Sequence, residues 1–216
     1  LASVKIKSSR KNKFSDSRKI LFAYQKIKES RHARKFNQLS RTNQLENLDI
    51  FSLNIDLQKI LSNNSSIAYG FEFATNNVYS DAYQQNFIVL SDMILSETNK
   101  IFETPTRYPS AKGSYNTSAM YYEIRKDISQ NSNINIGMRY TNTHLEAKWD
   151  DNEIIKAKLN DVTTTNSSLT TSIGFVYRPK NKWKLNANFS SGFRSPNIDD
   201  IGKIREQKGI LSVPNS

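Results

Sequence analysis

Apolar and polar residues alternate along several segments of the chain with a period of two. In the clearest segment, 133–140, one set of alternate positions is apolar: Ile134, Ile136, Met138 and Tyr140. Because successive side chains of a β-strand point to opposite faces, this pattern predicts strands that are apolar on one face only. Further segments share the pattern, some of them more weakly: 4–6, 20–24, 51–58, 67–73, 120–125, 169–177 and 183–190.

The predicted strands are joined by connections of two lengths. Three are short turns: 59–65, 127–132 and 178–182. Three are long: 30–46, 76–114 and 143–166. Short and long connections alternate, as they do in bacterial outer-membrane barrels with strands of ~9–11 residues. We therefore predict an all-β fold, an antiparallel meander of about eight strands that forms an open part of a large transmembrane β-barrel.

Alternation alone leaves open which face meets solvent. In a soluble sandwich the apolar stripe faces the core, whereas in a membrane barrel it faces lipid. The order of connections favours the barrel, with these lipid-facing residues: Phe51, Leu53, Ile55, Tyr69, Phe71, Ile134, Ile136, Met138, Ile173, Phe175, Leu185 and Phe189. Tyr140, Tyr177 and Trp183 lie at predicted strand ends and fit an aromatic girdle at the membrane interfaces. A general preference of aromatic residues for strands explains them as well.

Composition removes several classes of protein. The 216 residues include 11% aromatic residues, which is too many for a disordered chain, and no Cys, which excludes disulfides and thiolate zinc sites. No run of ~18 apolar residues predicts a membrane helix. The chain has two His and lacks Gly-rich phosphate loops and framed nucleophiles. We expect no enzymatic activity, no cofactor and no metal site.

Three motifs add a resemblance to a known family. Residues 188–202 read Asn-Phe-Ser-Ser-Gly-Phe-Arg-Ser-Pro-Asn-Ile-Asp-Asp-Ile-Gly. They resemble the Ser/Thr-Gly-Phe-Arg-Ala-Pro-Asn-x-Asp-Asp-Leu segment of TonB-dependent outer-membrane receptors. The matching residues are Gly192, Phe193, Arg194, Pro196, Asn197, Asp199 and Asp200. Residues 23–31, Ala-Tyr-Gln-Lys-Ile-Lys-Glu-Ser-Arg, are similar to a strand top of that family, and Thr106-Arg107-Tyr108-Pro109 with Gly113-Ser114 is similar to one of its loop exits.

The resemblance implies a 22-stranded barrel whose lumen is filled by an N-terminal plug domain. Residues 1–216 would then be a middle-to-late part of the barrel domain, without the plug and the closing strands. The implied parent is a receptor in the outer membrane of a Gram-negative bacterium. It would take up a scarce nutrient (ferric siderophore, haem, cobalamin or glycan) with energy supplied by TonB through the plug. Haem receptors of the family carry a His after the first motif, and residues 197–213 contain none.

Seven residues are candidate contacts to a ligand or to lipid. Arg31, Arg34 and Lys35 belong to a basic segment that we predict to be an outer loop near lipopolysaccharide phosphates or an anionic ligand. A merely solvated loop explains this segment equally well. The other four come from the motifs: Arg107, Tyr108, Arg194 and Asn197.

The motif around Pro196 has a structural explanation too. Pro196 lacks a ladder donor and should end strand pairing, and Arg194 should point inward and pair with Asp199 or Asp200. One other class of protein stays open because the net charge is +11. It is a soluble all-β binding domain whose basic surface engages glycans or nucleic acid. No nucleic-acid motif is present, and we do not expect nucleic acid as a partner.

Overall fold

Within the described residues, nine strands form a single antiparallel sheet. The computed structural model describes residues 1–90, 94–150, 160–180, 182–201, 205–207 and 210–212. The strands are β1 (Ala2–Ser8), β2 (Ser17–Arg34), β3 (Ser40–Ser62), β4 (Ser65–Leu90), β5 (Ile94–Glu103), β6 (Lys112–Ser129), β7 (Ser132–Lys148), β8 (Val162–Tyr177) and β9 (Leu185–Ser190). Eight of them lie in the order β1-β2-β3-β4-β6-β7-β8-β9, and β5 pairs with β4. The predicted open meander of eight strands is confirmed.

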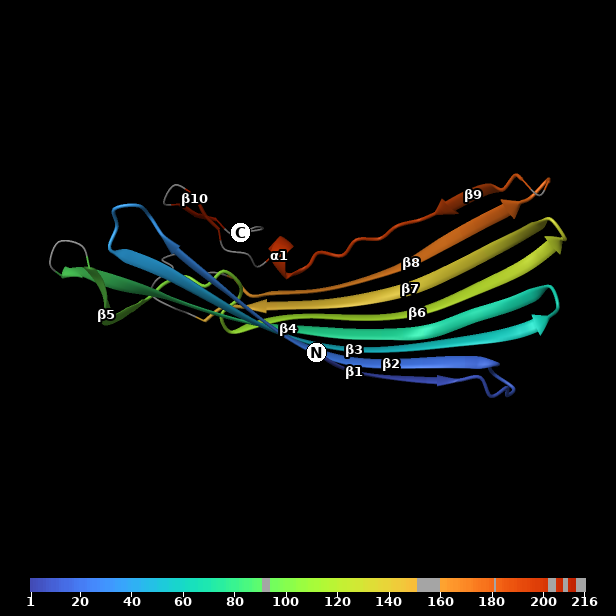
Figure 1. Cartoon of the computed structure of the whole chain (residues 1–216), viewed down its shortest axis with the longest axis horizontal. Coiled ribbons are helices and arrows are strands. Elements are labelled where there is room, and N and C mark those ends of the chain that lie inside the picture. Colours follow the sequence, from blue (N-terminus) through green and yellow to red (C-terminus); the bar gives the residue numbers. More distant parts are fainter. Residues whose placement is uncertain (91–93, 151–159, 181, 202–204, 208–209, 213–216) are drawn as a thin grey trace.

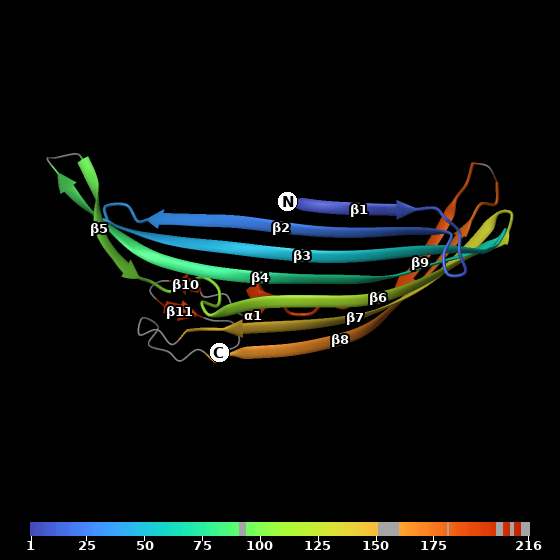
Figure 2. The same ribbon diagram turned by 90° about the horizontal axis from the view of Figure 1, so that it is seen from below.

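The sheet is long and curved, and the chain folds back over its concave side. After β9 the chain leaves the sheet and reaches a short helix, α1 (Ile198–Ile201), and a small hairpin of β10 (Arg205–Gln207) and β11 (Ile210–Ser212). Figure 1 shows α1 and β10 above the concave side of the sheet. Figure 2 shows β1, β2, β3, β4, β6, β7 and β8 side by side, with the turns after β1, β3, β6 and β8 gathered at one end. We call the concave side the inner face and the opposite side the outer face.

The predicted parity of the connections is present, but their lengths were wrong. The turns after β3, β6 and β8 lie at one end of the sheet, as expected. At the other end the strands continue far beyond the alternating segments, and β3 alone has 23 residues. The predicted loop 30–46 is largely strand, and only residues 35–39 connect β2 to β3. The predicted loop 76–114 contains the end of β4 and all of β5. The predicted loop 143–166 shrinks to residues 149–161, of which 151–159 lie outside the described residues.

Register places the predicted apolar residues on one face. One row of partners crosses seven strands and is apolar throughout: Ile6, Ile20, Ile55, Phe71, Met120, Tyr140 and Leu169. A second row joins Ile136 to Ile173 and Phe189. Side chains in these rows point to the outer face, because the polar partners between them meet on the inner face. Many remain exposed; Met120, Leu169 and Phe189 are 63%, 61% and 81% exposed.

The inner face carries polar contacts between strands, two of which reach over an intervening strand. The Tyr121 hydroxyl on β6 reaches over β4 and donates to Asp56 Oδ1 on β3 at 2.7 Å. Lys19 Nζ on β2 donates to Asp56 Oδ2 at 2.7 Å. Arg139 on β7 reaches over β6 and pairs with Glu72 on β4. The Tyr121–Asp56 and Arg139–Glu72 contacts join strands that share no backbone ladder, and they stiffen the curvature of the sheet.

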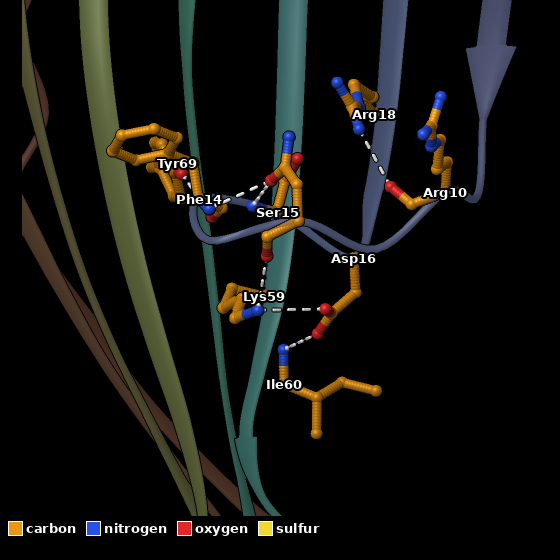
Figure 3. A network of polar contacts seen from close by, with 9 residues as sticks. Arg10, Phe14, Ser15, Asp16, Arg18, Lys59, Ile60 and Tyr69 are labelled. Atoms are coloured by element: carbon orange, nitrogen blue, oxygen red, sulfur yellow. Dashed lines mark hydrogen bonds and ion pairs between the residues drawn. The ribbon is translucent and has the colours of Figure 1, made fainter.

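The connection between β1 and β2 is fastened to the end of β3. Asn12 Oδ1 accepts hydrogen bonds from the N–H groups of Phe14 and Ser15, at 2.9 and 2.7 Å, and thereby closes a tight turn. Lys59 Nζ lies 3.0 Å from Asp16 Oδ1, and the Ile60 N–H donates to Asp16 Oδ2 at 2.7 Å (Figure 3). The bond from Ile60 and the charge of Lys59 hold the pKa of Asp16 below its usual range. The short-turn end of the sheet is thus pinned by side chains as well as by its ladders.

No helix within the described residues has the length and apolarity needed to cross a membrane.

Candidate functional site

Two segments fold onto the inner face at the end opposite the short turns. The first, residues 104–111, places Thr106 and Pro109 in buried positions, and the Tyr108 N–H donates to Ser80 Oγ on β4 at 3.4 Å. The second, residues 195–201, is attached through Ser195 Oγ, which lies 2.7 Å from Thr143 Oγ1 on β7. Both segments contain motif residues, and the sheet brings them together although they are far apart in sequence.

A reciprocal cap forms the start of α1. The Asp200 N–H donates to Asn197 Oδ1 at 3.0 Å, and the Asn197 N–H donates to Asp200 Oδ2 at 3.0 Å. This is a capping box, which satisfies two N–H groups that a helix start otherwise leaves unpaired. Arg194 Nη2 donates to both oxygens of Asp200, at 2.7 and 2.9 Å. The expected ion pair of Arg194 is therefore made with Asp200.

The helix is anchored by an apolar cluster on the inner face. Ile198 and Ile201 are buried against Leu145 and Ala147 of β7. Partly buried neighbours complete the cluster: Val78, Tyr108, Tyr115, Trp149 and Val162. Because Leu145 is 1% exposed and sits under the helix, burial of apolar area holds α1 on the sheet.

The two segments meet at Tyr108 and Asp199. The Tyr108 hydroxyl donates to Asp199 Oδ1 at 2.6 Å. Burial, followed by this bond to a carboxylate, raises the pKa of the Tyr108 phenol well above its usual value. Tyr108 is therefore a neutral donor, and the bond ties the 104–111 segment to α1.

A cavity of about 280 Å³ lies between these segments and the inner face of β2, β3 and β4. Its apolar lining comes from Ile27, Leu48, Val78, Tyr115 and Ile198. Its polar lining comes from Glu29, Glu46, Asn76, Tyr108, Asn197 and Asp199. The cavity lining thus combines apolar side chains with three carboxyl groups. This local negative charge contrasts with the net charge of the protein, which is +11.

Glu46 is the least expected member of this lining. Its side chain is 7% exposed, and both of its carboxyl oxygens are buried without a hydrogen-bond partner among the described residues. Register sets it directly opposite Glu29, whose Oε1 accepts a hydrogen bond from Arg31 Nε at 2.6 Å. Burial, and then the charge of Glu29, raise the pKa of Glu46. Sequence reasoning missed this pair because it depends on the β2–β3 register.

The predicted contact residues separate into two groups. Tyr108 and Asn197 line the cavity, and the Arg107 guanidinium lies 5.3 Å from the centre of the Tyr108 ring. Arg31 belongs to β2, not to the predicted loop, and pairs with Glu29. Arg34 ends β2, donating to the Gln38 carbonyl at 3.1 Å, and Lys35 lies in the connection that follows. Neither of these two lines the cavity. Gly202, the last residue of the 188–202 stretch, lies outside the described residues.

Fold and site together define the wall of a large β-barrel with a lined inner face at its loop end. The family model described as TonB dependent receptor-like, beta-barrel, matches residues 6–207. The chain belongs to this family, whose members are outer-membrane transporters and receptors of Gram-negative bacteria. A search of curated proteins found no match to the chain.

Proposed function

We propose that the chain forms part of the wall of an outer-membrane receptor that takes up a scarce nutrient with energy supplied by TonB. The 216 residues would supply consecutive strands of a 22-stranded barrel domain, and a plug domain elsewhere in the receptor would receive the contact with TonB. The apolar side chains of the outer face form a band, which includes the rows through Ile55 and Ile136 described above. The observation that carries this proposal is the course of this apolar band across the strands.

The apolar band runs obliquely across the register of the strands. On β2 its centre is Phe22, whose row of partners leads through Leu53 and Phe73 to Ser118 on β6 and Ser167 on β8. The band does not follow this row. On β6 its centre is Tyr122, four residues beyond Ser118, and on β8 it is Ile173, six residues beyond Ser167.

This offset matches the tilt of strands in a membrane barrel. Six residues along β8 correspond to about 20 Å at ~3.3 Å per residue, and five steps between neighbouring strands cover about 24 Å. A band that stays parallel to a membrane therefore requires strands tilted by about 40°, within the 35–45° of membrane barrels. A soluble sheet has no reason to shift its apolar face progressively in one direction from strand to strand.

The polar positions above the band support contact with lipopolysaccharide. Lys26 and Lys28 follow Tyr24 at every second position of β2, so they continue the outer face beyond the band. Arg34 continues the same series, and Lys35 follows it. We propose that these cations meet the phosphates of lipopolysaccharide, and that Tyr140, Tyr177 and Trp183 lie in the interfacial girdles. The twelve predicted lipid-facing residues would line the band between them.

The soluble alternative fits this face poorly. A soluble binding domain would leave an uncovered apolar surface that spans β1 to β9, with Ile136, Met138 and Ile173 between 41% and 49% exposed. Monomeric soluble proteins rarely expose apolar patches larger than a few hundred Å². Lipid is the covering that the tilt of the band favours.

Uptake by cells tests this proposal. The gene for the full receptor would be deleted in its Gram-negative host, and uptake of labelled ferric siderophore, cobalamin, haem and oligosaccharide would be compared with the parent strain. We expect loss of uptake of one of these, and an equal loss when TonB is removed. Uptake that is unchanged by both deletions contradicts the proposal.

Replacement of Arg107 or Arg194 by Ala should then reduce uptake if these residues contact the ligand.

A further inference from the structure

A role in the barrel wall does not explain the unpaired carboxyl of Glu46. A buried carboxylate without a hydrogen-bond or ion-pair partner costs several kcal/mol, so such groups are normally paired, protonated or ligated. Arg31, the cation whose charge acts on Glu46, is already bound to Glu29. Among the described residues nothing else neutralises Glu46, although it lines a cavity with room for a small molecule.

The cavity lining narrows the chemistry of an occupant. Glu29 and Asp199 lie in the same lining as Glu46, so an anion would be repelled. A bare divalent ion needs six or more oxygen ligands, whereas Ile27, Leu48 and Val78 supply apolar surface. A molecule with an amine or guanidinium group on an apolar body matches both the acidic and the apolar parts of the lining. Its charged group pairs with the carboxylate, and its carbon atoms displace water from the apolar side chains.

We infer that the cavity beside Glu46 is a binding site for an organic cation, in which the Glu46 carboxylate pairs with an ammonium or guanidinium group and Ile27, Leu48 and Val78 hold the apolar body. This inference rests on the proposed function, since it assigns a chemical class to part of the imported ligand. The Tyr108 hydroxyl, held on Asp199, closes one side of the site.

The position of the cavity suits first contact with a ligand from outside the cell. The Glu29–Glu46 pair lies five residues beyond the Tyr24–Phe51 pair, which is the last apolar row of the outer face on β2 and β3. This corresponds to about 17 Å along the strand at ~3.3 Å per residue. The cavity is thus above the band, on the inner face, and at the end with the longer connections, which in this kind of barrel is the extracellular end.

The charge state of Glu46 predicts how the affinity for a cation depends on pH. Because the pKa of the free carboxyl is raised by burial, a bound cation competes with a proton. Affinity for the cation should therefore fall as the pH drops through this raised pKa, while affinity for a neutral molecule of the same shape should not change.

The direct test compares a cation with its neutral counterpart. Benzylammonium and benzyl alcohol would be titrated by calorimetry into the purified full receptor in detergent micelles at neutral pH. We expect benzylammonium to bind at least about tenfold more tightly than benzyl alcohol, since a hydrogen bond to a charged partner is stronger than one between neutral groups. Glu46→Gln should reduce this preference to less than about twofold. Glu123→Gln, which removes an exposed carboxyl on the same face of β6, should leave it unchanged.

A second variant tests the apolar wall of the cavity without changing Glu46. Leu48→Phe adds a ring to the cavity wall and should weaken both probes together. An equal affinity of the unmodified receptor for the two probes, or a preference that survives Glu46→Gln, overturns the inference. Loss of stability in Glu46→Gln without any cation binding in the parent also overturns it, because the carboxyl would then be paired by a basic residue of another part of the receptor. Binding at equilibrium needs no TonB, so failure here is distinct from failure of TonB-dependent uptake.

Discussion

At the scale of single residues, Gly70 shows how the inner face depends on a missing side chain. A Cβ at this position would lie 2.2 Å from the Ile55 carbonyl oxygen and 2.7 Å from the Tyr121 ring. Without it, Tyr121 lies flat across β4 and reaches Asp56 on β3. Glycine is needed here for close approach, not for an unusual backbone angle.

Replacement of Gly70 by Ala should therefore destabilise the barrel. We expect a loss of about 1–3 kcal/mol in the free energy of unfolding, the usual range for overpacking, measured by urea unfolding in lipid vesicles. Gly192→Ala is the matched control, because no atom lies within 4 Å of its added Cβ. Equal stability of the two variants would show that both the Ile55 carbonyl and the Tyr121 ring can move aside.

Neighbouring residues of β8 test the assignment of the two faces. Ile173 lies at the centre of the apolar band, and Ser172 points to the inner face beside Gly137. At the bilayer midplane, Arg on the lipid side costs about 2–4 kcal/mol. Ile173→Arg should show this loss in vesicle refolding, whereas Ser172→Arg should cost far less. A larger penalty at Ser172 would reverse the faces.

Glu46 makes the stability of the receptor depend on pH. A raised pKa means that the folded state binds the proton more tightly than the unfolded state, so this contribution is complete below the ordinary value of 4.5 and is lost as the pH rises through the raised pKa. In the absence of added cations, Glu46→Gln should gain thermal stability relative to the parent as the pH rises above 4.5. A constant difference at all pH values would exclude a raised pKa.

At the scale of elements, α1 owes its place to its cap and to its apolar side. The helix has four residues, too few to be stable by propensity. It persists because Asn197 and Asp200 cap its start and because Ile198 and Ile201 are buried on β7. The motif residues therefore have a structural role that is independent of any ligand.

Removal of the cap should loosen α1 without unfolding the sheet. We expect Asp200→Ala to cost about 1 kcal/mol locally, which is a roughly fivefold faster hydrogen exchange at Ile201. Arg194→Ala should have a smaller effect, because the Arg194 side chain is 79% exposed and exposed ion pairs contribute little. A larger effect from Arg194 would assign the restraint to the ion pair instead of the cap.

Sequence patterns predicted the elements well where alternation was strong and poorly where it stopped. The segments around Ile55, Phe71 and Ile136 became strands with the predicted faces. Beyond the band the outer face is polar, as at the paired residues Lys26 and Asp49, and the few apolar residues, such as Ile27, lie on the inner face instead. The apolar stripe therefore stops, and a solvated strand there cannot be distinguished from a loop. The predicted loop 30–46 was wrong for this reason.

The cavity was not predictable, because it combines Glu46 with Tyr108 and Asn197, and only the register and the folded-back segments bring these together.

At the scale of the whole molecule, the apolar band and the sheet order describe one piece of a wide ring. From β2 through β6 to β8 the centre of the band shifts in the same sense. The inner-face bridges at Asp56 and Glu72 each span two ladders. A narrow closed barrel of eight strands would require a much tighter curvature than these bridges enforce. In the described part of the chain the sheet stays open instead, with β1 and β9 each paired on one side only.

These open edges lead to a prediction for residues 1–216 expressed alone. The free side of β1 and the part of β8 from Val162 to Thr170, which β9 leaves unpaired, present N–H and C=O groups that pair readily with another chain. The outer face also loses its lipid partner in water, since residues such as Met120 and Leu169 are more than 60% exposed. Without detergent, the polypeptide should elute from size-exclusion chromatography as large oligomers, and detergent should reduce their size. A compact monomer that melts cooperatively in plain buffer would mean that the edges and the apolar face are covered by the chain itself, and the membrane assignment would have to be abandoned.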